Sequence, residues 1–359
     1  MDRQRKPATA ATTGSTVSIL SDLSCAAIVS LDIGFGVVKA ITHTGKTALF
    51  PSVAGHARQL NFHADKIAER YPGDQLWDDE GSWFIGDLAL TQLLQGEVVR
   101  LRGRNANDHG SEFRLRMMKA ALGKLFVGLR GGDGTVINVQ VATGLPVAHM
   151  ADSALVKAQL IGAHRIQTDQ SDFIVNVTKV MVMPQAYAAI YTKLLSEAGE
   201  IDREHVAVET GVIDVGTYTV DFARDSDGTY QDVESGSAEA GVYNVHERVA
   251  RGLQDRYKQE FGYKVVEASI REKRIKIAGK VEDCTEIVEE AIESLRAATV
   301  SKAYELWKDA KHIEEIYLMG GGASLVADAL AYPQIQTLPN PQWANARGYL
   351  NFALFKANE

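Results

Sequence analysis

Short apolar runs separated by glycine turns open the patterned part of the chain. From Ala26 onward the runs are "AAIVSLDI", "GVVKAITH" and "KTALFPS". Apolar runs of this length, bounded by turn residues, predict β-strands, and the tight turns between them predict antiparallel pairing. We therefore expect an antiparallel meander that begins a mixed sheet.

The middle of the chain alternates between strand-like and helix-like patterns. The segments "GTVINVQVATGLPV" and "DFIVNVTKVMVMPQ" predict strands. Helices are expected at "SEFRLRMMKAALGKLFVGL", capped by Ser111, at "SALVKAQLIGAH", and at "PQAYAAIYTKLLSEAG", with Pro184 near its first turn. One face of the first helix carries Met118, Leu122, Leu125 and Leu129. Residues 57–110 are polar and lack a clear period, so we expect irregular structure there.

The second half of the chain repeats the plan of the first. The segment "VAVETGVIDVGTYTVDFARD" predicts strand, turn and strand, and residues 242–261 and 284–306 predict helices. A strand that runs into a helix start is expected at "EEIYLMGGGASLV", and a short helical end near "QWANARGYLNFALF". Both halves open with a strand that ends in Asp and turns at glycine. The sequence thus predicts a duplicated α/β unit with a ligand cleft between the copies.

Length and composition limit the class of protein. At 359 residues the chain exceeds the usual size of one core, and its 45% hydrophobic and 23% charged residues are ordinary for a soluble globular protein. The net charge of −8 argues against a generally basic nucleic-acid surface, so direct nucleic-acid binding is not expected. No apolar stretch is long enough to span a bilayer.

The N-terminal residues and the two cysteines give evidence about the cellular compartment of the protein. Residues 1–25 are basic and then rich in Thr, Ala and Ser, which predicts a flexible tail, with a docking arm as the alternative. This segment has no clear secretory pattern. Cys25 and Cys284 lack metal-site spacing, so we expect reduced thiols and a cytoplasmic protein.

The turn "LDIGFGVVKA" suggests a phosphate cradle. Asp32 ends an apolar strand, Gly34 and Gly36 form the turn, and Lys39 lies in the strand that follows. Glycines let backbone N–H groups approach phosphate oxygens, and a lysine offsets phosphate charge. The simpler alternative for one such turn is a polar hairpin.

The segment "VIDVGTYTVDFA" supplies a matching turn with Asp214, Gly216, Thr217, Thr219 and Asp221. An Asp on each turn could hold Mg²⁺ through water against the same phosphates, because Mg²⁺ keeps much of its hydration. A third element, "YLMGGGASLV", places three glycines between a strand and a helix start, where backbone can pass close to a flat group or a phosphate. Together the three elements predict a nucleotide site.

These motifs resemble those of the actin-like ATPase superfamily. "DIGFGVVK" is similar to its first phosphate loop, "DVGTYTVD" to the second, and "MGGGASLV" to the adenosine loop. "VATGLPV" with "MPQAYAAIY", and "NARGYLNFA", resemble the two connecting segments. "FPSVAG", "FIGDLA" and "GLPV" look like the prokaryotic plasmid-segregation (ParM/StbA-like) group and its archaeal relatives. The resemblance covers nearly all of the chain from Ala26 onward.

The resemblance implies the fold and the domains. It implies an α/β, actin-like (ribonuclease H-like, duplicated) fold of two lobes with mixed sheets and an interlobe nucleotide cleft. Lobe I would span residues 26–203 and be completed by about 340–359, and lobe II would span 204–339. In this superfamily the region corresponding to residues 57–110 often lies on a subunit contact, so an interface is expected there.

The resemblance also implies residue roles. Gln185 would orient the attacking water, and Asp214 would be the metal-linked catalytic carboxylate, with Asp32 as its partner at Mg²⁺. The expected phosphate-binding residues are Asp32, Gly34, Phe35, Gly36, Lys39, Gly216, Thr217, Tyr218 and Thr219. The expected adenosine-binding residues are Glu272, Lys273, Lys276, Gly320, Gly321, Gly322 and Ala323. The alternative for residues 272–276 is a solvated basic helix face, or a surface for a neighbouring subunit or DNA.

Two positions depart from the family pattern. Phe35 replaces a small hydroxyl residue, so one γ-phosphate contact would come from backbone alone. Thr217-Tyr218 replaces a second glycine, which places a bulky ring near the phosphates or forces it outward.

The expected function is a filament-forming ATPase that uses ATP, with GTP as the alternative, and Mg²⁺. Its partners would be further copies of itself and a DNA-bound adaptor, and its role plasmid or DNA segregation. Two alternatives stay open, namely a small-molecule kinase with Asp152 as a conceivable base (a helix cap is the simpler explanation) and a non-hydrolysing nucleotide-binding scaffold. A chaperone is disfavoured because the chain ends shortly after the second connecting segment.

Overall fold

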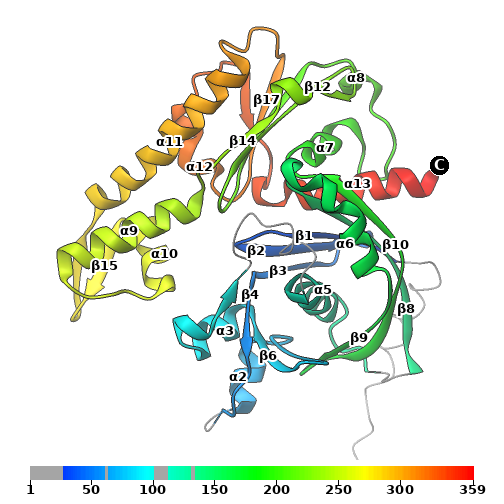
Figure 1. Cartoon of the computed structure of the whole chain (residues 1–359), viewed down its shortest axis with the longest axis vertical. Helices are drawn as coiled ribbons and strands as arrows, with labels where there is room; N and C mark the ends of the chain where they lie inside the picture. The colour runs from blue at the N-terminus through cyan, green and yellow to red at the C-terminus, as the bar shows by residue number, and fades with distance from the viewer. Residues whose placement is uncertain (1–26, 61–63, 101–111, 131–133) are drawn as a thin grey trace, which may run out of the picture.

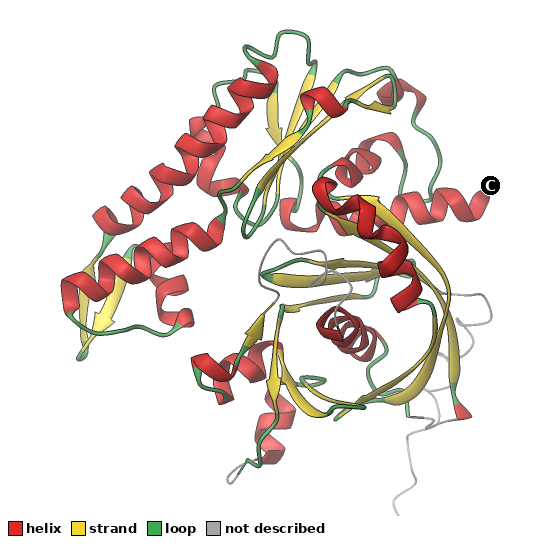
Figure 2. Ribbon diagram, viewed as in Figure 1, coloured by secondary structure: helices red, strands yellow, loops and turns green. Residues whose placement is uncertain are grey.

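The computed structural model describes residues 27–60, 64–100, 112–130 and 134–359. They form two lobes, each built on a mixed β-sheet with helices (Figures 1 and 2). The predicted tail at residues 1–25, Cys25 and the predicted cap Ser111 lie outside the described residues. In the described part, no helix combines the length and apolarity needed to cross a membrane.

The first sheet begins with the predicted meander. Strands β1 (Ala27–Ile33), β2 (Val37–Thr42) and β3 (Thr47–Pro51) pair antiparallel in chain order. β8 (Val136–Leu145) then pairs parallel with β1, and β10 (Asp172–Pro184) parallel with β8. β1 is buried along its whole length, as expected of a strand in the middle of a sheet.

Five further strands extend this sheet to ten, in the order β3-β2-β1-β8-β10-β9-β5-β6-β4-β7. They are β9 (Gly162–Thr168), β5 (Gln75–Asp78), β6 (Gly81–Ile85), β4 (Val53–His56) and β7 (Val99–Arg100). Three of these strands, β5, β6 and β7, lie within residues 57–110, together with helices α2 (Ala64–Arg70) and α3 (Gly86–Gln92). The expectation of irregular structure over residues 57–110 was therefore wrong in the described part. These elements are too short for a readable period, and pairing with distant strands stabilises them.

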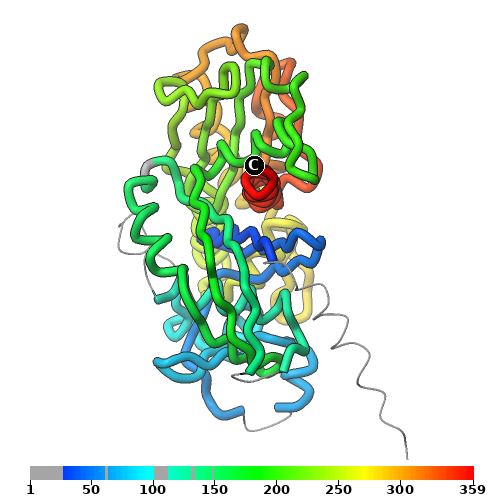
Figure 3. The backbone as a smooth tube through the Cα atoms, turned by 90° about the vertical axis from the view of Figure 1, so that its right-hand side faces the viewer, coloured from blue at the N-terminus to red at the C-terminus, as the bar shows by residue number. Residues whose placement is uncertain are grey.

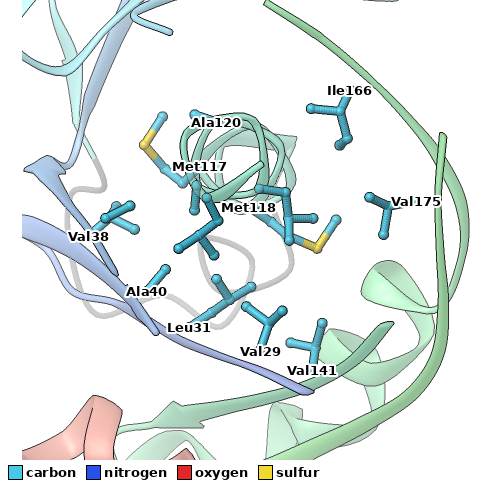
Figure 4. Close-up of a cluster of buried hydrophobic side chains, with 14 of the residues drawn as sticks. Val29, Leu31, Val38, Ala40, Met117, Met118, Ala120, Val141, Ile166 and Val175 are labelled. Carbon is cyan, nitrogen blue, oxygen red and sulfur yellow. The ribbon is translucent and has the colours of Figure 1, made fainter. Parts of the chain in front are cut away.

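Helix α5 (Glu112–Leu125) lies inside the curve of the first sheet. The sequence predicted one apolar face, but α5 is buried on nearly every side, including Met117, Met118 and Ala120. Figure 4 shows these residues against Leu31 and Val38 from the strands. A helix enclosed by a curved sheet has no solvent face, which explains the difference.

The second sheet repeats the core of the first. β11 (Thr210–Val215) pairs antiparallel with β12 (Val220–Ser226) and parallel with β17 (Glu315–Met319), which pairs parallel with β18 (Ile335–Thr337). β13 (Thr229–Tyr230) and β14 (Gly236–Ala238) pair with β12. The order β12-β11-β17 thus matches β2-β1-β8 in pairing direction, as the duplicated plan predicted.

Helices and a small hairpin complete the second lobe. They are α9 (Val242–Tyr257), α10 (Tyr263–Glu272), the hairpin β15 (Arg274–Ile277) with β16 (Lys280–Asp283), α11 (Thr285–Trp307) and α12 (Ala323–Val326). α9 and α11 contact each other along their length (Figure 1). The run "SIREKRIKIAG" is therefore the end of α10 followed by a strand, and not one basic helix face.

The remaining helices are distributed over both lobes. They are α6 (Ser153–Leu160), α7 (Tyr191–Leu194), α8 (Arg203–Val206) and α13 (Ala344–Asn358), with 3-10 turns η1 (Gln95–Glu97), η3 (Val147–Asp152), η4 (Tyr187–Ile190), η5 (Asp232–Glu234), η6 (Ala327–Ala329) and η7 (Pro341–Trp343). The helix predicted at "SALVKAQLIGAH" is confirmed over Ser153–Leu160, but its last three residues begin β9. The helix predicted from Pro184 is wrong at its start, because Pro184 ends β10 and Ala186 has a φ of 63°. α13 packs on β1, β2, β8 and α7, and Figure 3 shows it end-on between the lobes.

Candidate nucleotide site

The predicted phosphate turns of the two lobes line one cavity of about 850 Å³. Asp32 lies near the end of β1, and Asp214 near the end of β11, so each carboxylate comes from the strand that leads into its turn. Both are buried. The cavity is lined by Asp214 and by every predicted phosphate-binding residue, namely Asp32, Gly34, Phe35, Gly36, Lys39, Gly216, Thr217, Tyr218 and Thr219.

The two hairpins place different partners opposite their Asp residues. In lobe I, Asp32 is directly across the strand pair from Lys39, whose Nζ lies 2.6 Å from Asp32 Oδ2. In lobe II the corresponding pair is Asp214 with Asp221. Two carboxylates that face each other repel. The two cavity walls therefore differ in charge, although both hairpins pair their strands in the same way.

Burial and neighbouring acids change the chemistry of Asp214. Burial first, and then the charges of Asp221 and Asp32, raise the pKa of Asp214 to about 7. A 2.8 Å hydrogen bond donated by Asn345 Nδ2 to Asp214 Oδ2 opposes this rise. Burial also raises the pKa of Asp221, which accepts hydrogen bonds from Ser237 and, at 2.8 Å, from Thr219 Oγ1. A cation bound in the cavity would favour the ionised form of both carboxyl groups.

The two turns touch each other across the cleft. A side chain at Gly36 would come within 2.6 Å of Thr217 Oγ1, so a larger residue there would force Thr217 to move. The Phe35 ring meets the Tyr218 ring edge to face at 5.1 Å, and Tyr218 packs on Tyr243 at 4.8 Å. The unusual Phe35 and Tyr218 thus contact each other, and the Tyr218 ring borders the cavity.

The glycine run after β17 forms another part of the wall. Gly320 has a φ of 92°, and a side chain there would collide with the Asp214 carboxylate. Gly320 and Gly321 line the cavity, whereas Gly322 and Ala323 do not. Gly322 instead donates its N–H to Val215 O at 3.0 Å, which ties the run to the second turn.

The predicted adenosine contacts are only partly brought together. Lys273 lines the cavity, has a φ of 54° at the end of α10, and forms an ion pair with Glu289 of α11. Glu272 is exposed and pairs with Arg271, and Lys276 lies in the β15 hairpin. Neither Glu272 nor Lys276 lines the cavity, so their roles stay predictions.

Gln185 lines the cavity from the end of β10. Its N–H donates to Leu145 O at 2.7 Å, and its carbonyl accepts from Tyr187 N at 2.7 Å. The tight turn at Ala186 and these two hydrogen bonds therefore fix the backbone of Gln185 at the cavity. This arrangement suits a group that orients a small molecule.

The mouth of the cavity is bridged by contacts between the lobes. Lys264 Nζ of α10 lies 3.1 Å from Asp87 Oδ1 of α3 and 3.2 Å from Thr91 Oγ1. The Arg100 guanidinium lies over the Tyr263 ring, 4.6 Å from its centroid. We call these contacts the latch.

Among the cavity-lining residues that sequence reasoning missed are Arg114 and Asn345. Asp221 was part of the predicted second turn, and the aligned hairpins place it where lobe I has Lys39. Arg114 is 1% exposed on α5, and burial lowers its pKa to about 10, so it stays charged at neutral pH. No spacing in the sequence links Arg114 or Asn345 to the turns.

Asp32 and Asp214 are better suited to a cation that keeps its waters than to a cation bound only by protein ligands. In the described part, no group of three His, Cys, Asp or Glu side chains is placed to hold a metal ion. Mg²⁺ usually keeps several waters and uses one or two carboxylates with substrate phosphates. Asp32 and Asp214, on opposite walls of one cavity, match that requirement.

Comparisons with known proteins agree with this architecture. Residues 30–187 match a family model described as the N-terminal domain of actin-like proteins, and residues 212–332 match that of the archaeal actin homologue MreB-like C-terminal domain. No curated protein sequence matches the chain.

Solved structures match over nearly the whole chain. A non-polymerisable quadruple mutant of pCBH ParM is 22% identical, with a TM-score of 0.74 over 92% of this chain and 99% of that one. A 15-stranded ParM filament from Clostridium botulinum is 21% identical, with a TM-score of 0.74 over 91% and 98%. The archaeal actin homologue Ta0583 is 18% identical, with a TM-score of 0.73 over 91% and 99%, and has also been crystallised with ADP.

Proposed function

Because the chain is an actin-like protein, we propose that it is a nucleotide-dependent ATPase that assembles into filaments. One observation carries the proposal: Asp32 of lobe I, Asp214 of lobe II and Gln185 line the same cavity. A triphosphate bound there would touch both lobes. A ligand shifts a conformational equilibrium only when it binds one state better, and contacts on both walls provide that difference.

The chain's own residues supply the parts that phosphoryl transfer to water needs. Backbone N–H groups of the two turns would face the phosphates, and Lys39 and Arg114 would offset their charge. Gln185 can accept one hydrogen bond and donate another, so it would orient the attacking water without acting as a strong base. This predicts slow hydrolysis.

Asp32 and Asp214 would hold Mg²⁺ through its waters. When bound, the ion supplies neutralisation of charge on the nucleotide phosphates. ATP is the proposed nucleotide, with GTP as the alternative, and ADP in the matched Ta0583 structure supports a nucleotide in this fold.

Filament assembly is supported by the matched ParM filament. We propose that this protein likewise forms a homopolymer in the cytoplasm, and that the polymer positions plasmid or other DNA through a DNA-bound adaptor. Residues 57–110 are the proposed subunit contact, and the described part of that segment projects from lobe I as α2, α3 and their strands (Figure 1).

The test combines phosphate release with pelleting and negative-stain electron microscopy. Filaments and phosphate should appear with ATP and Mg²⁺ and not without nucleotide, and GTP is tested in parallel.

Gln185→Ala should lower turnover about 100-fold while nucleotide still binds. Gln231→Ala changes a partly buried glutamine that does not border the cavity and serves as the matched control. A wild-type protein that stays monomeric with every nucleotide would refute the filament proposal.

The kinase alternative gains no support from the site. Asp152, its conceivable base, does not line the cavity and lies 3.9 Å from His149 Nδ1. Asp152 also makes no side-chain cap hydrogen bond to α6, so the capping explanation is wrong. The scaffold alternative predicts unchanged turnover in Gln185→Ala, and the same assay decides it.

A further inference from the structure

Two consecutive residues at the start of α13 hold the two lobes together beneath the cavity. Asn345 Nδ2 donates to Asp214 Oδ2 of β11 at 2.8 Å. The next residue, Ala346, accepts a 2.6 Å hydrogen bond at its carbonyl from Ser30 Oγ of β1. Both bonds are buried, where a hydrogen bond is strong and costly to leave unmade.

Ser30 and Asp32 stand on the same face of β1, because successive side chains in a strand point to opposite faces. The start of α13 is thus hydrogen-bonded to β1, the strand that carries Asp32. Through Asn345 it is also hydrogen-bonded to Asp214 itself. We therefore expect the distance between Asp32 and Asp214 to depend on these two hydrogen bonds.

The side-chain oxygen of Asn345, Oδ1, is evidence for a bound ligand. Asn345 is 8% exposed and lines the cavity. Within the described residues, Asn345 Oδ1 is buried without a hydrogen-bond partner. A buried acceptor left unpaired costs free energy, and a water or hydroxyl of a bound ligand would satisfy it.

We propose that Asn345 is a positioning residue for Asp214, a role that rests on the proposed function. Its Nδ2 fixes the orientation of the Asp214 carboxylate, and its Oδ1 accepts from a water in the shell of the hydrated cation. Partners that orient metal-linked groups typically change metal affinity 10–100-fold when they are removed. Asn345 is therefore responsible for much of the gain in nucleotide affinity that Mg²⁺ provides.

The experiment measures binding of a fluorescent ATP analogue (mant-ATP) in Mg²⁺ and in EDTA. Asn345→Ala should lower the ratio of the two affinities about tenfold, because the affinity in Mg²⁺ falls about ten times more than the affinity in EDTA. Asn345→Leu keeps a similar volume without polar atoms and should give the same ratio, and it replaces the alanine variant if that fails to fold. A ratio within twofold of wild type, or an equal loss in both conditions, overturns the proposal.

A matched control lies on the same helix. Asn351 is also buried on α13 but donates to Leu195 O at 3.2 Å, away from Asp214. Asn351→Ala should keep the wild-type ratio even if it lowers stability. A fall in its ratio equal to that of Asn345→Ala would assign the effect to the helix and overturn the proposal.

A double-mutant cycle tests whether Asn345 acts through Asp214. Asp214→Asn should lower the Mg²⁺ ratio. Asn345→Ala added to it should lower the ratio by a smaller factor than it does alone, because the part of its effect that passes through the Asp214 carboxylate is already lost. Additive losses would overturn the proposal. A wild-type protein whose nucleotide affinity ignores Mg²⁺ would instead refute the proposed function, so the two failures are distinguishable.

Discussion

The Phe35 ring meets the Tyr218 ring edge to face, with centroids 5.1 Å apart, and joins the phosphate turn of lobe I to that of lobe II. Such pairs contribute about 0.5–1.5 kcal/mol beyond their buried area. The two bulky residues that depart from the family pattern are therefore one contact between the lobes.

This contact predicts an effect on nucleotide binding. Tyr218→Ala should weaken binding of ATP with Mg²⁺ about fivefold, because the closed arrangement loses the ring pair. Calorimetric titration measures the change. Tyr218→Phe keeps the ring and should bind like wild type, and equal weakening in both variants would assign the effect to the hydroxyl.

The ion pair of Asp32 with Lys39 predicts a large effect on stability. Lys39→Met leaves a buried carboxylate without its cation, which should lower the free energy of unfolding of the nucleotide-free protein by about 3 kcal/mol. Urea denaturation measures it. Adding Asp32→Asn removes the buried charge and should recover most of the loss. A single variant as stable as wild type would contradict the prediction.

The raised pKa of Asp214 predicts how stability depends on pH. The folded pKa is about 7 and the ordinary value is 3.8, so between these values the unfolded state releases a proton that the folded state keeps. The contribution of Asp214 to stability therefore falls as pH rises from about 4 to about 7 and is constant above that range.

Asp214→Asn should remove this slope, since roughly 1.4 kcal/mol accompanies each pKa unit. The nucleotide-free variant should be more stable than wild type at pH 8, by a few kcal/mol, and equal to it near pH 3.5. Thermal unfolding across pH checks both points. Parallel curves for the two proteins would show that Asp214 ionises freely in the folded state.

The latch predicts a salt-dependent rate of nucleotide release. Lys264 and Asp87 are about half exposed, and such pairs contribute about 0.2–1 kcal/mol and weaken in salt. Lys264→Ala should speed release of mant-ATP about threefold in low salt and match wild type in high salt. Stopped-flow chase experiments measure the rate. A difference that persists in high salt would mean that the pair acts by packing.

The sequence by itself determined the repeated plan. Two apolar strands that end in Asp32 and Asp214, each followed by a glycine turn, were readable because strand period and turn residues are local signals. The same local signals placed the glycine run and the long helices. They failed over residues 57–110, where short strands pair with distant ones, and at Pro184, which ends a strand instead of starting a helix.

Only the tertiary structure decided which residues meet. Asn345 contacts Asp214 and Arg114 borders the same cavity because α13 and α5 pack on strands far away in the chain, and no spacing encodes that. The electrostatic contrast between the walls also belongs to the fold. Lys39 and Asp221 occupy matching positions, but the charge of Asp214 depends on burial, and burial is a property of the whole packed molecule.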